Sequence, residues 1–72
     1  MNIKEVIDLV EKWIADPKSV SRKELKVARD AARSADDADD AYAARAASAD
    51  SWYGDTDGAK FWVAEHYRRI ND

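Results

Sequence analysis

Four aspartates at the centre of the chain are the residues whose spacing most suggests chemistry. They are Asp36, Asp37, Asp39 and Asp40 of the segment DDADD. Carboxylate oxygens are the ligands that Ca²⁺ and Mg²⁺ prefer, so a metal site is one interpretation. On a helix, however, the four side chains point in different directions, and no loop nearby supplies carbonyl oxygens. We therefore expect neither a metal ion nor a cofactor, and interpret the segment as a charged surface.

The turn GDTDG resembles part of a calcium-binding loop. It runs from Gly54 to Gly58 and contains the pattern DxDG. The preceding acid and the closing glutamate of an EF-hand loop are missing. We interpret the segment as a turn in which Asp55, Thr56 or Asp57 caps the following helix, and the sequence does not choose among them.

Asp39, Tyr42 and His66 are candidates for a buried polar cluster. On a helical wheel Asp39 and Tyr42 fall in an alanine-rich face, and His66 lies in the apolar face of the last helix. A covered carboxylate needs a partner, so an Asp39–His66 pair beside Tyr42 is one hypothesis, and a histidine packed by its ring alone is the other. No nucleophile and no oxyanion loop accompany these residues. We therefore predict that the chain is not an enzyme and has no catalytic residue.

A charged face with a basic half and an acidic half includes three of the aspartates. It consists of Arg22, Lys26, Arg29, Arg33, Asp36, Asp37 and Asp40. The basic half could contact phosphate groups, but we favour a solvated face, and the net charge of -3 makes nucleic acid an unexpected partner. Because basic and acidic halves adjoin, the face suits a charged protein partner or an antiparallel copy of the chain.

Three helices, in a single domain of residues 1–72, must position these groups. We predict them over about 2–15, 21–53 and 57–70. Asn2 with Glu5, and Ser21 with Glu24, have the spacing of N-terminal capping boxes. No Gly or Pro interrupts the second helix before Gly54, which fits a C-terminal cap.

The alanines of the second helix determine the predicted packing. Small residues on one face let neighbouring helices approach closely, so we predict an all-α bundle in which a long central alanine-rich helix is flanked by two shorter antiparallel amphipathic helices. Beyond Asp40, Ala44 and Ala47 occupy the opposite face as well. This second small face predicts a second contact, made either by a bend in the helix or by another chain, or it reflects only the high helix propensity of alanine. We favour self-association as a dimer.

Candidate interaction residues lie at the margins of the apolar faces. Leu9, Trp13 and Phe61 are large residues in such places, and Ala44 and Ala47 complete the set. Exposed aromatic residues are typical interface anchors, although scattered exposed apolar residues are ordinary on protein surfaces.

The order of the segments resembles a known group of proteins. A short amphipathic helix leads to DPKSVSRKEL, then to an alanine-aspartate-tyrosine helix, then to WYGDTDGAKFWVAEHY. In this the chain resembles small alanine-rich accessory proteins, of uncertain function, from large tailed bacteriophages. The resemblance carries over no catalytic or binding residue. It implies an auxiliary role acting on host machinery.

The predicted function is contact with another protein. The chain has no cysteine and no apolar run of the roughly 20 residues that a membrane span needs, so we expect no membrane association and a location in the cytoplasm of a bacterium or a phage-infected bacterium. We predict a small non-enzymatic interaction protein, and the resemblance implies an accessory factor that modulates a host protein. The alternative is an acidic nucleic-acid mimic that inhibits a DNA- or RNA-binding host protein, with charge presented by Asp36, Asp37, Asp40 and Asp50.

Overall fold

Over the residues that the structure describes, the protein is all-helical, as predicted, but these residues form four α-helices where the sequence predicts three. The computed structural model describes residues 1–34 and 38–71, with side chains for all of these except 38–40 and 71. The helices are α1 (Ile3–Ala15), a short 3₁₀ helix η1 (Pro17–Ser19), α2 (Arg22–Ser34), α3 (Ala38–Tyr53) and α4 (Thr56–Asn71). No strand occurs in these two ranges. The first and last helices agree with their predicted bounds to within a residue or two.

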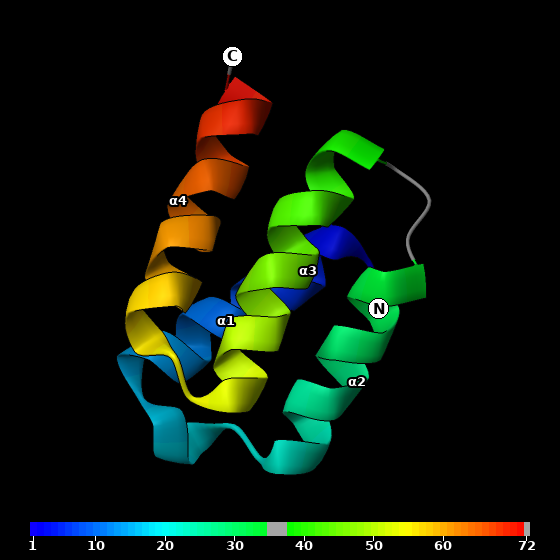
Figure 1. The fold of residues 1–72 in the computed structure, drawn as a ribbon. Coiled ribbons are helices and arrows are strands. Elements are labelled where there is room, and N and C mark those ends of the chain that lie inside the picture. The colour runs from blue at the N-terminus through cyan, green and yellow to red at the C-terminus, as the bar shows by residue number, and fades with distance from the viewer. Residues whose placement is uncertain (35–37, 72) are drawn as a thin grey trace.

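The prediction of one central helix over 21–53 is wrong. In its place α2 ends at Ser34, α3 begins at Ala38, and the two lie side by side and antiparallel (Figure 1). The Arg22 Nη1 donates a hydrogen bond of 2.6 Å to the carbonyl oxygen of Trp52, although a continuous helix would hold these residues about 45 Å apart. The whole chain is only 32 Å long, which is shorter than a straight helix over 21–53.

Helix α3 lies at the centre of the arrangement. It packs against α2 on one side and α4 on the other, and α1 crosses obliquely behind this layer (Figure 1). Helix α1 contacts all three of the other α-helices, whereas the described parts of α2 and α4 do not touch. The first helix therefore does not flank a single long central helix, which the sequence predicts. It covers a layer of three helices instead.

The core combines the large side chains of α1 with small side chains from the other helices. Val6, Ile7 and Val10 of α1 are fully buried. The fully buried residues opposite them are mostly alanines, namely Ala28, Ala32, Ala44, Ala47 and Ala59. Small residues let the helix backbones approach closely, and the branched side chains of α1 fill the space between them.

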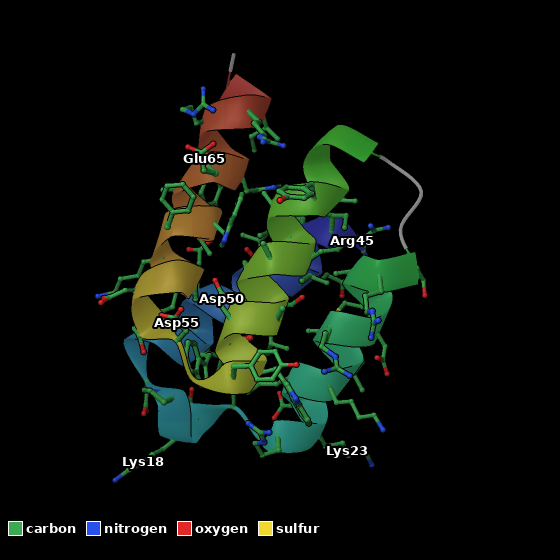
Figure 2. The ribbon with its side chains drawn as sticks, in the orientation of Figure 1. Lys18, Lys23, Arg45, Asp50, Asp55 and Glu65 are labelled. Carbon is green, nitrogen blue, oxygen red and sulfur yellow. The ribbon has the colours of Figure 1, made fainter. Side chains whose placement is uncertain are left out.

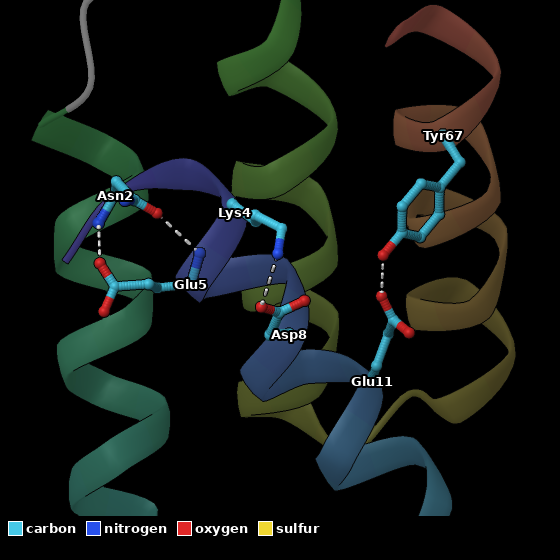
Figure 3. A network of polar contacts seen from close by, with 6 residues as sticks. All are labelled: Asn2, Lys4, Glu5, Asp8, Glu11 and Tyr67. Atoms are coloured by element: carbon cyan, nitrogen blue, oxygen red, sulfur yellow. Dashed lines mark hydrogen bonds and ion pairs between the residues drawn. The ribbon is translucent and has the colours of Figure 1, made fainter. Parts of the chain in front are cut away.

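Helices α1 and α2 begin with their predicted capping boxes. At α1, Asn2 Oδ1 accepts from the Glu5 N–H at 2.8 Å and Glu5 Oε1 accepts from the Asn2 N–H at 3.1 Å (Figure 3). Ser21 and Glu24 make the same reciprocal pair before α2, at 3.1 and 3.2 Å. These hydrogen bonds satisfy backbone donors that the first turn of a helix leaves free.

The turn GDTDG ends α3 and begins α4. Gly54, with φ +81°, donates to the Ser51 carbonyl, and the Asp55 N–H donates to the Asp50 carbonyl at 2.8 Å, which together form a Schellman motif. Asp55 then caps α4, because its Oδ1 accepts from the Gly58 N–H at 2.9 Å. The structure thus selects Asp55 among the three predicted caps.

Substitution of Gly54 tests this turn without disturbing side-chain packing. A Cβ at this position would meet no atom within 4 Å, so the cost of Gly54→Ala is that of the left-handed backbone alone. We expect the free energy of unfolding, measured by urea denaturation, to fall by about 1–2 kcal/mol. Gly54→Asn should lose less, because asparagine tolerates this conformation better. Equal stability of Gly54→Ala and the wild type would contradict the assigned turn.

Candidate interaction surface

Three aromatic side chains of α3 and α4 form a contiguous exposed cluster, here called the aromatic ridge. It consists of Tyr42, Phe61 and Trp62. The Tyr42 and Trp62 ring centroids lie 5.3 Å apart at an interplanar angle of 75°, and those of Phe61 and Trp62 lie 5.0 Å apart at 84°. Tyr42 and Phe61 are each 55% exposed. Edge-to-face pairs of this kind stabilise each other by about 0.5–1.5 kcal/mol beyond the area that they bury.

The close pairing of α3 with α4 positions the ridge. Ala43 and Ala59 are fully buried, which keeps the large side chains of the two helices at their outer margins. Trp62 is half-buried and packs against the core, so one of its edges is anchored. The guanidinium carbon of Arg69 lies 5.8 Å from the Tyr42 ring centroid, within the range of a cation–π contact.

The composition of the ridge is that of an interface anchor. Isolated exposed apolar side chains are ordinary, but contiguous exposed apolar clusters mark binding surfaces more often. Aromatic residues and arginine dominate the binding energy of protein interfaces. The ridge therefore has the chemistry of a protein contact.

Of the predicted interaction residues, only Phe61 lies on this ridge. Trp13 is 7% exposed and belongs to the core, and Leu9 is half-buried against that core. Ala44 and Ala47 are fully buried. The second small face predicted on α3 is thus covered within the single chain, because α3 packs against its own neighbours.

Of the predicted polar cluster, His66 is buried and Tyr42 is not, and the Asp39–His66 pair stays a prediction. Tyr42 is exposed and contacts Trp62, and the side chain of Asp39 lies outside the described residues. His66 is buried, at 6% exposure, and its ring meets the Tyr67 ring at a centroid distance of 5.3 Å. Among the side chains that the structure describes, none forms a hydrogen bond with its Nδ1.

The predicted charged face is covered in part by α3. The guanidinium carbons of Arg22 and Arg29 lie 3.9 and 5.0 Å from the Trp52 ring centroid. Lys26 and Arg33 are exposed. Asp36 and Asp37, and the side chain of Asp40, lie outside the described residues. Sequence reasoning missed the role of Trp52, because a continuous helix would place it far from Arg22.

A polar contact between α1 and α4 was also not predicted. The Tyr67 hydroxyl donates a short hydrogen bond to Glu11 Oε1 (Figure 3). This hydrogen bond raises the pKa of Tyr67 to about 12, and burial and the negative charges of Glu11 and Asp8 act in the same direction. The hydrogen bond joins the C-terminal half of α4 to α1.

Comparison with protein-family models, curated proteins and solved structures gave no match. The resemblance to phage accessory proteins therefore stays a prediction. Over the two described ranges, no helix has both the length and the apolarity to cross a bilayer. The same residues contain no group of three acidic or histidine side chains that could hold a metal ion.

The Glu11–Tyr67 contact predicts a loss of stability at alkaline pH. The unfolded tyrosine has a pKa of about 10, so the folded state retains this proton over a range in which the unfolded state has lost it. The stabilisation is therefore complete below pH 10 and is lost as the pH rises through about 12. We expect Tyr67→Phe to lower the free energy of unfolding by about 1 kcal/mol at pH 8 and by progressively less above pH 10.

The control for this experiment is Tyr53→Phe, because the Tyr53 side chain is 78% exposed. Its effect should be small and should not follow the pH dependence of Tyr67→Phe. A difference between wild type and Tyr67→Phe that stays constant from pH 8 to 12 would contradict the assigned hydrogen bond.

Proposed function

We propose that the chain is a non-enzymatic interaction protein that binds a partner protein through the aromatic ridge of α3 and α4. The observation that carries this proposal is the mutual contact of Tyr42, Trp62 and Phe61, two of which are more than half exposed. In a chain of 72 residues such rings would be expected in the core if stability alone determined their place.

The ridge is held in place before any partner binds. Trp62 is fixed by the core, and it contacts both of the exposed rings. Side chains that are already ordered lose little conformational entropy on association, so their burial contributes more of its free energy to binding. The partner surface that fits this ridge is apolar, and we expect the affinity to depend weakly on salt.

The sequence argument for self-association through α3 does not hold in the folded chain. The expectation of a dimer depended on Ala44 and Ala47, which are buried in the single chain. A second copy would instead have to use the aromatic ridge. The resemblance to phage accessory proteins favours a different partner, a protein of the bacterial host.

The alternative function, an acidic nucleic-acid mimic, has less support. Of its four aspartates, only Asp50 has a described side chain. Its Oδ2 lies 2.4 Å from the position that a Cβ of Gly58 would occupy, and so it faces the turn between α3 and α4 (Figure 2). Burial, together with the charge of Asp55, raises the pKa of Asp50. This carboxylate does not extend into solvent as part of a row.

The test of the proposed function compares capture of bacterial proteins by wild type, Phe61→Asp and Val27→Asp. Val27 is a matched control, because it is 47% exposed on α2 and is not in the ridge. We expect Phe61→Asp to weaken binding of a specific partner at least 30-fold, as for a hot-spot residue worth about 2 kcal/mol, and Val27→Asp to leave it unchanged. Unfolding curves should show that both variants are folded, with Phe61→Asp losing no more than about 0.5–1.5 kcal/mol, the contribution of its ring pair with Trp62.

Three outcomes would contradict the proposed partner or the proposed surface. A partner lost equally with both variants would not bind the ridge. Binding that falls steeply as salt rises would favour the acidic mimic. A concentration-dependent dimer of the isolated chain that Phe61→Asp dissociates would identify a second copy as the occupant of the ridge.

A further inference from the structure

A groove between α2 and α3, on a different surface from the aromatic ridge, gathers three arginines. Its volume is about 310 Å³, and it is lined by Arg29, Arg33, Arg45, Ala49 and Tyr53. The first two residues come from α2 and the other three from α3. The antiparallel packing of the two helices therefore creates the groove, and a continuous helix would not contain it.

Contacts on either side of the groove hold two of the arginines in place. The Arg29 guanidinium lies over Trp52. Arg45 reaches from α3 to the last turn of α2, where its Nε donates to the Ala32 carbonyl at 3.3 Å and its Nη2 to the Arg33 carbonyl at 3.4 Å (Figure 2). These two hydrogen bonds use two of the five N–H groups of the Arg45 guanidinium, and the other three can donate to an anion in the groove.

The positive charge of the groove is not neutralised by the described carboxylates. The ion pairs among the described residues join Lys4 to Asp8 and Arg68 to Glu65, and none involves an arginine of the groove. Arginine stays protonated at every ordinary pH, so three guanidinium groups repel one another when no anion is present. The Nε of Arg29 is buried and has no acceptor among the residues that the structure describes, which is a costly state for a charged donor.

We propose that this groove binds a nucleoside phosphate, with the phosphate on the three arginines and the base against Tyr53. Guanidinium groups match the geometry of phosphate oxygens, and an oxyanion in the groove would supply the acceptors that the exposed Arg33 lacks within the described residues. Tyr53 is 78% exposed, so its ring is available for stacking on a base. Ala49 adds no bulk to the groove, whose volume is at the lower end for small-molecule sites.

The test is a calorimetric titration of the full chain with adenosine monophosphate, inorganic phosphate and adenosine. We expect the monophosphate to bind more tightly than inorganic phosphate, and adenosine to bind more weakly than either. Arg33→Gln should weaken binding of the monophosphate at least tenfold, through the loss of charged hydrogen bonds. Tyr53→Leu should weaken the monophosphate about tenfold and leave inorganic phosphate unchanged.

The matched control is Lys23→Gln, which removes the same charge from the N-terminal end of α2, outside the lining of the groove and far from Arg45 (Figure 2). It should weaken binding less than twofold. Equal losses in Lys23→Gln and Arg33→Gln would overturn the proposal in favour of diffuse attraction, and so would the absence of binding at millimolar monophosphate. If Tyr53→Leu bound adenosine monophosphate as tightly as the wild type, the placement of the base against Tyr53 would be wrong. Phe61→Asp should leave all three titrations unchanged, because the ridge is a separate surface.

Discussion

Close approach of helices through alanine is the constraint on which this structure depends. The fully buried side chains of α3 are alanines and serines, and Ser48 and Ser51 satisfy their hydroxyls by donating to carbonyls of their own helix. Such a helix adds little apolar volume, so its stability depends on the backbones of α2 and α4 lying close to it. The large apolar side chains come mainly from α1, which crosses all three. One amphipathic helix thus supplies much of the bulk for a core that the others line with small residues.

The use of small residues at the helix contacts also determines which large side chains lie at the surface. Because alanines occupy the contact between α3 and α4, the larger residues of those helices lie at its margin, where Tyr42, Trp62 and Phe61 meet. Because α2 and α3 are antiparallel, Trp52 lies beneath the arginines of α2, and Arg45 lies at the end of that helix. Both candidate binding surfaces are therefore consequences of helix pairing, and neither is a local motif.

The local features of the fold could be predicted from the sequence, and the tertiary ones could not. The capping residues Asn2 and Ser21 and the helix end at Gly54 depend on neighbours within a few positions, and the structure confirms them. The separation of α2 from α3 has no glycine or proline to mark it. Four neighbouring aspartates weaken a helix by only a few tenths of a kcal/mol per like-charged pair, which is a small signal. Burial of Ala44 and Ala47 favours two helices over one, and a helical wheel cannot show whether that burial occurs within one chain or between two.

The candidate surfaces show the same limit. Phe61 could be recognised because it lies opposite the apolar face of its own helix. The sequence predicts Tyr42 in a buried polar cluster, since it does not reveal that the rings of Tyr42 and Trp62 meet at the surface. The sequence places Arg29 and Arg33 on a solvated face, because Arg45 and Tyr53 join them only after the helices pair.

The most direct test of this account is paramagnetic relaxation from a nitroxide label on Lys23→Cys to the Trp52 indole N–H. The chain has no native cysteine, so labelling is specific. The isotope-labelled, nitroxide-bearing chain is diluted into unlabelled wild type, so that only contacts within one chain contribute. The account predicts strong broadening of the Trp52 signal, because the neighbouring Arg22 bonds to the Trp52 carbonyl at 2.6 Å. A sharp Trp52 signal would contradict it, since a continuous helix would hold the two sites more than about 40 Å apart.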